Sequence, residues 1–265
     1  NYMGGLSREY IRDRIENSDC ILCLGAIMSD MNLGGNTAKL DDRKLINANS
    51  EKVKIKYHFY QPVYLGDFID GLIGHLEHKE AATLDIKPSS YSLDRPFIPQ
   101  PAEKLTNIRF YERVNHFIED DSIVIADTGD AIVATMDLLM REKTNFIGQA
   151  FYLSIGYSIP ACLGAAMAAP QTRPIVFVGD GAFQMTAQEL STIIRHKLNP
   201  IIFLINNDGY TIERVIQDGA YNDLQPWKYH QMPQVFGESW SCEVRTEGEL
   251  EIALVKAKAN TKSVS

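Results

Sequence analysis

The sequence of 265 residues lacks the features that mark several classes of protein. No apolar run approaches the roughly 20 residues that a membrane-spanning helix needs. No Asn-x-Ser/Thr acceptor for glycosylation occurs in it. Lys and Arg number 26 against 34 Asp and Glu, which gives a net charge of -8. Because neutralising phosphates requires clustered basic side chains, we do not expect nucleic acid as the main partner. Without a long apolar run, we do not expect a membrane as a partner either.

Cysteine is also scarce, with four residues in the chain. Cys20 and Cys23 have the C-x-x-C spacing of some zinc and redox sites, but they lie in the apolar run 20–24, which predicts a buried strand. Residues three apart in a strand point to opposite faces, so the pair does not easily share a metal. No second pair of Cys or His completes a ligand set. We therefore predict core cysteines and a reducing, cytoplasmic setting.

Short apolar runs alternate with longer amphipathic segments, which is typical of an α/β protein with parallel sheets. Strands are predicted at 20–24, 44–47, 122–126, 175–178, 201–205 and 242–245. Helices are predicted at 8–17, 67–77, 104–118, 131–140, 156–169, 186–197 and 249–259. The segment 81–101 has several prolines and no periodicity, as linkers do. We therefore predict two Rossmann-like parallel-sheet domains, at 1–80 and 102–265.

Two of the predicted buried strands end abruptly in glycine and polar residues. The strand 175–178 is followed by Gly179-Asp180-Gly181, and the strand 201–205 by Asn206-Asn207-Asp208-Gly209-Tyr210. Ligands of open α/β sheets bind at the carboxyl ends of strands. Carboxylate, amide and carbonyl oxygens there would suit Mg²⁺ or Ca²⁺, and the N–H groups that follow can face an anion. Either sequence alone would also make an ordinary tight turn.

Taken together, the two strand ends resemble the diphosphate-binding signature of thiamine-diphosphate-dependent enzymes. The strings 179–189 and 206–213 are similar to those of the pyruvate and indolepyruvate decarboxylase branch, as is Tyr221-Asn222-Asp223-Leu224 with Trp227 downstream. The resemblance extends over essentially the whole chain, including a stretch from Tyr2 to about Glu77 that is similar to the family's middle domain. It implies a thiamine-diphosphate- and Mg²⁺-dependent decarboxylase that converts a 2-oxo acid, such as indole-3-pyruvate, to an aldehyde and CO₂.

The resemblance implies roles for individual residues. The metal ligands would be the Asp180 carboxylate, the Asn207 amide oxygen and the Gly209 carbonyl. The cofactor-binding residues would be Gly181, Ala182, Tyr210, Thr211 and Ile212, with Thr128, Gly129 and Asp130 in a second loop. The segment 151–156 resembles the one that meets the aminopyrimidine, with Ser154 in it and Ile155 as an apolar wedge. Leu153 stands where relatives usually have Gly, and we do not expect a leucine to adopt a positive φ.

Glu213 is the residue that the resemblance implicates in catalysis, as a proton-transfer group in a partly dry cleft. The same position would also suit a surface glutamate paired with Arg214 or Lys228. In this family the diphosphate half-site of one subunit faces the pyrimidine half-site of its neighbour, which implies a homodimer or homotetramer. The glutamate that activates the pyrimidine belongs to an amino-terminal domain that this sequence does not contain. We therefore expect the fragment alone to be inactive.

Other functions stay open at this stage. Acetohydroxyacid synthases and pyruvate oxidases share the Gly-Asp-Gly and Asn-Asn frame, although we do not expect Tyr210-Thr211-Ile212-Glu213 in them. A nicotinamide-binding domain would need Gly or Ala where Gln184 stands. A non-catalytic oligomerisation fragment is the alternative from a different class. Among 2-oxo acids, indole-3-pyruvate, phenylpyruvate, branched-chain acids and pyruvate all need the same machinery.

Overall fold

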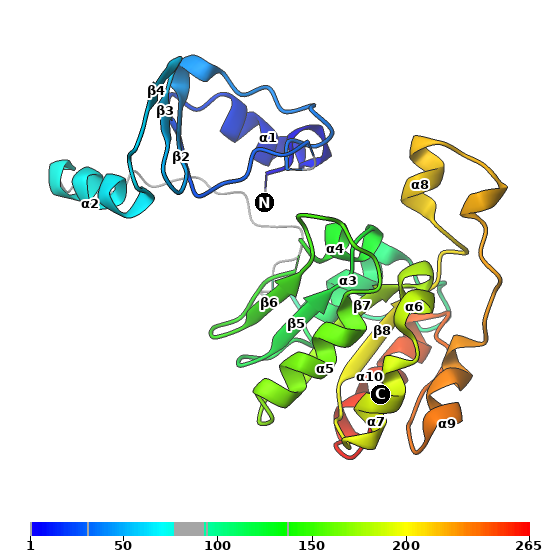
Figure 1. The fold of residues 1–265 in the computed structure, drawn as a ribbon. Helices are drawn as coiled ribbons and strands as arrows, with labels where there is room; N and C mark the ends of the chain where they lie inside the picture. The colour runs from blue at the N-terminus through cyan, green and yellow to red at the C-terminus, as the bar shows by residue number, and fades with distance from the viewer. Residues whose placement is uncertain (1, 31, 77–92, 94, 137) are drawn as a thin grey trace. The chain divides into compact units, whose positions relative to one another are not determined.

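The computed structural model describes residues 2–30, 32–76, 93, 95–136 and 138–265. The chain divides into two compact units, Asn1–Ile86 and Lys87–Ser265 (Figure 1). Most of the predicted linker, 81–101, lies outside the described residues. Strands and helices occur in both units, so the α/β class expected from the sequence is confirmed.

Unit 1 is built around a four-stranded sheet of order β1-β2-β3-β4. Its elements are η1 (Gly4–Leu6), α1 (Glu9–Glu16), β1 (Ile21–Leu24), η2 (Asp42–Lys44), β2 (Leu45–Ala48), β3 (Val53–Ile55), β4 (His58–Tyr60) and α2 (Leu65–His75). The pair β1 and β2 is parallel as predicted, whereas β2, β3 and β4 are antiparallel. The strands β3 and β4 were not predicted because each has only three residues, too few for a periodic pattern.

The prediction of a buried strand at 20–24 is only partly right. A strand forms there, but β1 is an edge strand, and Leu22 and Leu24 are each 42% exposed. Cys20 is exposed and Cys23 half-buried, so the prediction of core cysteines is wrong for this pair. All four cysteines are free, and Cys162 is the buried one.

Unit 2 contains a four-stranded parallel sheet of order β6-β5-β7-β8. Its strands are β5 (Ile123–Ala126), β6 (Asn145–Gly148), β7 (Pro174–Gly179) and β8 (Ile201–Ile205). Its helices are α3 (Asn107–Asn115), α4 (Asp130–Thr135), α5 (Ser158–Ala168), α6 (Asp180–Thr186), α7 (Glu189–Arg195), α8 (Thr211–Ile216), η3 (Ala220–Asn222), η4 (Tyr229–Gln231), α9 (Met232–Phe236) and α10 (Glu247–Ala259). The helix predicted at 186–197 is therefore α7 alone, preceded by a separate α6.

The strand predicted at 242–245 is wrong. That segment is irregular, and an isolated bridge joins Lys104 to Thr246 next to it. Thr246 instead begins α10 with a capping box, in which its hydroxyl accepts from the Glu249 N–H and the Glu249 carboxylate accepts from the Thr246 N–H. Local capping thus directs the chain into a helix at this point.

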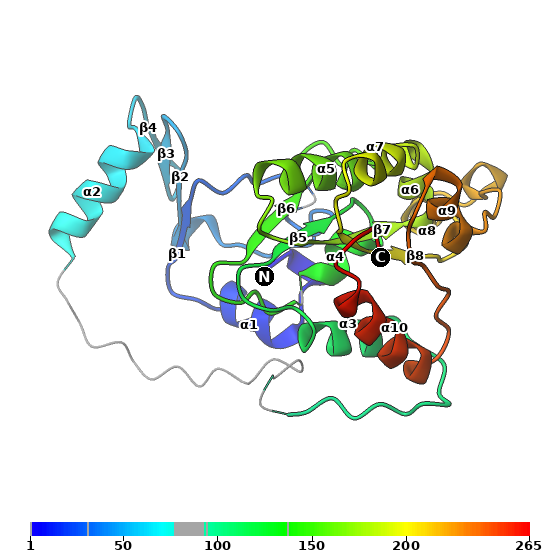
Figure 2. The same cartoon turned by 90° about the horizontal axis from the view of Figure 1, so that it is seen from below.

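Alternating side chains of the parallel strands build a core on each face of the sheet. Val176 and Val178 pack with α5, α6 and α7, whereas Ile175 and Phe177 pack with α3, α4 and α10. Figure 2 shows α5 and α7 on one side of the sheet and α3 and α10 on the other. Phe177 is fully buried and stacks on Phe203 with ring centroids 5.3 Å apart. Burying one such ring stabilises the fold by about 1.5–3 kcal/mol. The sheet that contains β7 is thus the middle layer between two layers of helices.

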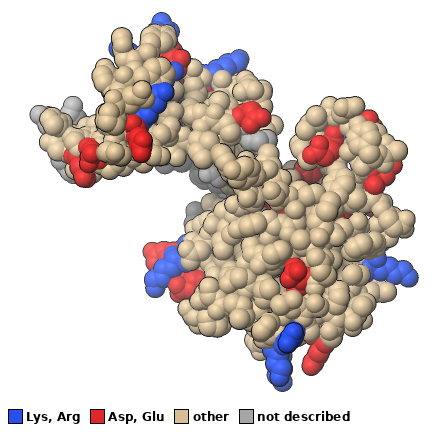
Figure 3. Space-filling view, in the orientation of Figure 1, with Lys and Arg blue, Asp and Glu red and all other residues tan. Residues whose placement is uncertain are grey.

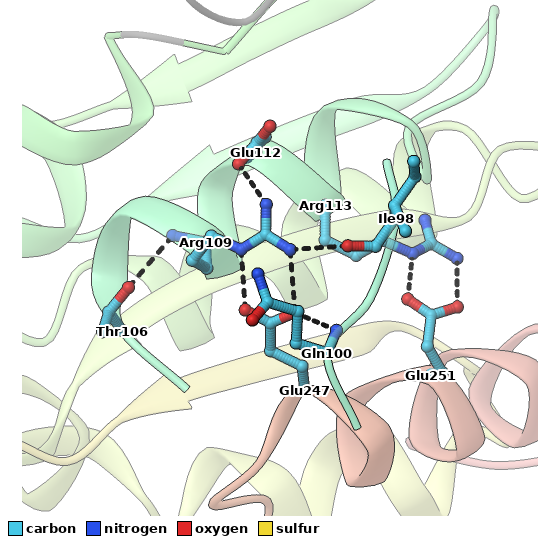
Figure 4. Close-up of polar contacts among 8 residues, drawn as sticks. All are labelled: Ile98, Gln100, Thr106, Arg109, Glu112, Arg113, Glu247 and Glu251. Carbon is cyan, nitrogen blue, oxygen red and sulfur yellow. Dashed lines mark hydrogen bonds and ion pairs between the residues drawn. The ribbon is translucent and has the colours of Figure 1, made fainter. Parts of the chain in front are cut away.

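An ion pair between a partly exposed arginine and a buried glutamate joins α3 to the start of α10 (Figure 4). Nε and Nη2 of Arg109 donate to the two carboxylate oxygens of Glu247 at 2.6 and 2.8 Å. The backbone N–H of Gln100 donates to the same carboxylate at 2.7 Å. Glu247 is only 2% exposed, and its bonds to the Arg109 guanidinium lower its pKa to about 2. The pair thus ties the segment before α3 to the carboxy-terminal helix of the unit.

Charged side chains are dispersed on the face drawn in Figure 3. Lys and Arg lie there in separate groups rather than in one continuous stripe. Within the part of the chain that the structure describes, no helix has both the length and the apolar character needed to cross a membrane.

Candidate functional site

Loops follow β5, β6 and β8 at the carboxyl edge of the unit 2 sheet, whereas β7 leads directly into α6. The chain passes from β5 to β6 on one side and returns to β7 on the other, so β5 and β7 flank a topological switch point. Open α/β sheets bind their ligands at such a point. The residues proposed from the sequence follow β5, β6, β7 and β8 along the chain, either in loops or at the starts of α4, α6 and α8, so all of them belong to the same edge of the sheet.

Asp180 is the first residue of α6 and is 2% exposed. Its Oδ1 accepts from the Gly181 N–H at 2.8 Å, and its Oδ2 accepts from the Gly209 N–H at 2.9 Å. The second bond joins the start of α6 to the loop after β8. Burial raises the pKa of Asp180, and the negative charge of Asp208 raises it further, although the two backbone N–H groups oppose this shift. A cation beside this carboxylate would therefore stabilise it.

Asn207 connects the β8 loop to the start of α4. Its Nδ2 donates to Asp130 Oδ2 at 2.8 Å, so this bond does not use the amide oxygen. The carbonyl of Gly209 accepts from the Thr211 N–H at 3.0 Å and keeps a second lone pair. Among the described residues, no group of three His, Cys, Asp or Glu could hold a metal ion. A cation at this edge would therefore need amide and carbonyl ligands, which Mg²⁺ and Ca²⁺ accept.

Two glycines are required by close approach of the chain. A Cβ on Gly181 would lie 2.4 Å from the Tyr210 ring. A Cβ on Gly209, which has a φ of +127°, would lie 2.6 Å from both the Asn222 carbonyl oxygen and Arg214 Nη2. Any larger residue would push the loops apart. Gly181 and the buried Ala182 thus place the first turn of α6 directly against the β8 loop, as a phosphate-binding edge requires.

The hydroxyl oxygen of Thr211 is buried, and the described residues give it no hydrogen-bond partner. Thr211 begins α8, directly after Tyr210, whose N–H donates to the Asn222 carbonyl at 3.1 Å. An unpaired buried hydroxyl costs about 1–3 kcal/mol. A ligand oxygen at the carboxyl edge would give this hydroxyl its missing partner.

Asp127 organises the β5 loop, a role that the sequence analysis missed. It is fully buried, and its carboxylate accepts from the N–H groups of Thr128, Gly156 and Ser158 at 2.9, 3.0 and 2.8 Å. These bonds join the β5 loop to the end of the β6 loop. The signal was a carboxylate directly after a buried strand, but the same signal marks ordinary turns. Gly129 follows with a φ of +103° and leads into Asp130.

The β6 loop contains Ser154 and Ile155, both exposed, with Ile155 at 37%. The expectation that Leu153 would not adopt a positive φ is wrong, because its φ is 56°. At the end of the loop, the Thr186 hydroxyl donates to the Gly156 carbonyl at 2.8 Å. The loop is thus attached to α6, although within the described chain no hydrogen bond joins Ser154 or Ile155 to the metal-ligand candidates.

The dry surroundings expected for Glu213 are not formed by the described residues. Glu213 and Ile212 lie exposed on α8, which stands away from the body of unit 2 in Figure 1. Among the residues that the structure describes, Glu213 pairs with neither Arg214 nor Lys228, the two alternative partners. Nη2 of Arg214 instead donates to Asp223 at 3.0 Å and to the Asp208 carbonyl at 2.7 Å. Arg214 thus fixes the β8 loop, which the sequence analysis did not anticipate.

Known proteins resemble this chain closely enough to compare. Residues 127–265 match the family "Thiamine pyrophosphate enzyme, C-terminal TPP binding domain". A pyruvate decarboxylase of Aspergillus fumigatus is 37% identical over 241 residues, which are 89% of this chain and 42% of that protein. An alpha-keto-acid decarboxylase of Mycolicibacterium paratuberculosis is 33% identical over 261 residues, 97% of this chain and 46% of the relative. The chain therefore spans less than half the length of these relatives.

A solved structure from Mycobacterium smegmatis, described as a thiamin diphosphate-dependent enzyme, has a TM-score of 0.59 to this chain. The sequences are 19% identical, and the match covers 78% of this chain and 38% of the other. At this identity the likeness shows a shared fold.

Proposed function

Because this chain belongs to the thiamine pyrophosphate enzyme family, we propose that it supplies the diphosphate- and Mg²⁺-binding half of a 2-oxo acid decarboxylase. The observation that carries the proposal is the hydrogen bond from the Gly209 N–H to the buried Asp180, which joins the two candidate loops. The decarboxylase names of the relatives favour this reaction over those of acetohydroxyacid synthases and pyruvate oxidases. Indole-3-pyruvate or a broad range of 2-oxo acids is the proposed substrate, with pyruvate as the alternative.

The residues at the carboxyl edge fit the cofactor. Asp180, Asn207 and the Gly209 carbonyl would hold Mg²⁺. The first turn of α6 and the Thr211 hydroxyl would hold diphosphate oxygens, which supports the fit because that hydroxyl is buried and unpaired. When bound, thiamine diphosphate supplies the electron sink for loss of CO₂. The protein contributes binding, orientation and exclusion of water.

Glu213 is the proposed proton-transfer residue. It is the third residue of α8, so it lies within one helical turn of Thr211. Its exposed position means that another part of the whole protein would have to provide low-polarity surroundings. We therefore propose that the enzyme is a homodimer or homotetramer in which this surface is covered.

The test is Glu213→Gln in the whole protein, assayed with pyruvate, phenylpyruvate, indole-3-pyruvate and a branched-chain 2-oxo acid. Gln keeps the shape of the side chain but cannot deliver a proton. Aldehyde formation should fall by about 10²–10⁴-fold, the usual contribution of a positioned acid–base group. Calorimetric affinity for thiamine diphosphate should change little. Glu238→Gln, at another exposed position of unit 2, is the control and should leave both unchanged.

Two results would contradict this role. Turnover near that of the wild type would make Glu213 a surface residue. Simultaneous loss of cofactor binding and turnover would make it structural. If the wild-type protein forms no aldehyde from any substrate but binds the cofactor, the decarboxylase assignment fails while the cofactor site stands.

A further inference from the structure

The first residues of the β6 loop are held in place by Gln149. Its carbonyl accepts from the Thr128 hydroxyl at 2.8 Å, which attaches it to the β5 loop. Its side-chain Oε1 accepts from the N–H groups of Phe151 and Tyr152, both at 3.1 Å. These bonds fix the direction in which the loop leaves β6.

The end of the loop is held just as firmly. The Gly156 N–H donates to the buried Asp127 carboxylate at 3.0 Å, and the Gly156 carbonyl accepts from the Thr186 hydroxyl at 2.8 Å. A Cβ on Gly156 would lie 2.8 Å from Met185 Cβ, so this end also packs tightly against α6. The residues between the two anchors therefore have little conformational choice.

Leu153 lies between the anchors with a φ of 56°. In this left-handed region the Cβ of an L-residue approaches its own backbone closely, whereas glycine adopts the conformation without strain. Strain of this kind persists only where the surroundings impose it, and it concentrates at functional sites. The anchors at Gln149 and Gly156 impose it here.

The same loop presents large apolar side chains at the carboxyl edge. Phe151 and Tyr152 are 60% and 78% exposed and contact each other edge to face, with ring centroids 4.7 Å apart. Ile155 is 37% exposed, and Leu153 is half-buried. Apolar groups on a rigid, strained loop beside a polar diphosphate edge are suited to the apolar ring portion of a ligand whose charged portion lies on α6.

We propose that Leu153 is a positioning residue, whose side chain contacts the ring portion of bound thiamine diphosphate. This inference rests on the proposed function. It concerns a position where relatives usually have Gly, so the side-chain contact is not implied by the resemblance. The left-handed backbone keeps the loop in the shape that a glycine would give it, and the leucine side chain adds apolar contact at the expense of stability in the cofactor-free protein.

The test compares Leu153→Gly with Leu153→Ala in the whole protein. Gly removes both the strain and the side chain, whereas Ala removes the side chain and keeps the strained Cβ. The cofactor-free Leu153→Gly protein should melt at a higher temperature than the wild type, and Leu153→Ala should not. Calorimetric affinity for thiamine diphosphate with Mg²⁺ should fall by roughly 10-fold in both variants, because both lose the contact of one partly buried apolar side chain.

Lys197 provides a matched control. It also has a left-handed φ, of 54°, but it precedes β8 and so lies at the opposite, amino edge of the sheet. Lys197→Gly should raise the melting temperature and leave the affinity for the cofactor unchanged. It thus separates relief of strain from loss of contact.

Wild-type affinity in both Leu153 variants would overturn the proposal, because the leucine would then be merely tolerated. Weaker binding in Leu153→Gly alone would also overturn it, because backbone flexibility and not the side chain would be responsible. If the wild-type protein itself binds no thiamine diphosphate, the proposed function fails, and this inference fails with it.

Discussion

Two buried carboxylates in unit 2 have the same exposed fraction, but their pKa values are shifted in opposite directions. Asp180 begins α6, Glu247 begins α10, and each is 2% exposed. Hydrogen bonds from Arg109 lower the pKa of Glu247 to about 2. Burial raises the pKa of Asp180, which has backbone N–H donors and the nearby negative charge of Asp208. Burial alone therefore does not decide the direction of the pKa shift. The charge of the neighbouring group decides it.

The difference separates a structural carboxylate from one that needs a ligand. Glu247 has its positive partner within the fold, so its charge is already compensated. Asp180 forms no salt bridge within the described part of the chain, and a buried charge without a partner is unfavourable. A cation bound beside Asp180 would compensate its negative charge, as Arg109 compensates the charge of Glu247.

The largest expected effect comes from removing the uncompensated carboxylate. In Asp180→Ala the affinity for thiamine diphosphate in the presence of Mg²⁺ should fall by more than about 100-fold, because a direct metal ligand contributes at least as much as the groups that orient one. The fold should survive, since no ion pair is broken. Calorimetric titration of the whole protein measures the affinity, and circular dichroism checks the fold. An unchanged affinity would remove Asp180 from the metal site.

The second prediction concerns the compensated carboxylate and pH. The pKa of Glu247 is lowered from 4.5 to about 2 in the folded chain. A lowered carboxyl pKa adds stability above the unfolded value, and that stability is lost as pH falls from about 4.5 toward 2. We expect a loss of about 2–3 kcal/mol over this window, less than the full shift implies because the Arg109 side chain is 26% exposed.

Urea unfolding between pH 5 and pH 2 measures this dependence, with Glu247→Gln as the comparison. The variant should be less stable than the wild type at pH 5, and the gap between the two should narrow on acidification. Its affinity for the cofactor should equal that of the wild type, in contrast to Asp180→Ala. If the difference in unfolding free energy between the two proteins stays constant with pH, the pKa of Glu247 does not change on folding, and the prediction is wrong.

The sequence predicted three of the four strands of the unit 2 sheet: the two central strands, β5 and β7, and the edge strand β8. Runs such as 175–178 and 201–205 are continuous apolar segments, and they became β7 and β8 because both faces are covered by helices. The edge strand β6 was missed because Asn145, Phe146 and Gly148 are exposed and carry no buried pattern. Likewise, local sequence does not distinguish Asp127 from Asp180, since each follows a buried strand directly.

The two aspartates differ in their tertiary contacts. Asp127 accepts from the N–H groups of Gly156 and Ser158, which lie 29 and 31 residues away, so its carboxylate is satisfied by the chain. The positions of the Asp180 and Asn207 loops could be expected from the family pattern. Three further features depend on which segments pack together, and no sequence pattern predicts them. They are the missing partner of the Thr211 hydroxyl among the described residues, the positive φ of Leu153 and the exposure of Glu213.

The smallest expected effect concerns Thr211, which extends the comparison from charges to a neutral group. Its buried hydroxyl has no partner in the described chain, as Asp180 has no cation. Thr211→Val keeps the shape, so the cofactor-free protein should be as stable as the wild type or gain about 0.5–1 kcal/mol. Affinity for thiamine diphosphate should fall by roughly 10-fold, because a hydrogen bond to a charged oxygen is lost.

Ser158 offers the matched control for this last effect, because its buried Oγ likewise has no hydrogen-bond partner among the described residues. It lies at the start of α5, where its backbone N–H donates a hydrogen bond to the Asp127 carboxylate. Ser158→Ala should therefore gain a similar small stability without any loss of cofactor affinity. Loss of affinity in Thr211→Val alone would identify the Thr211 hydroxyl as a ligand of the diphosphate. Equal behaviour of the two variants would show that an unpaired buried hydroxyl at this edge is a packing defect and carries no information about the ligand.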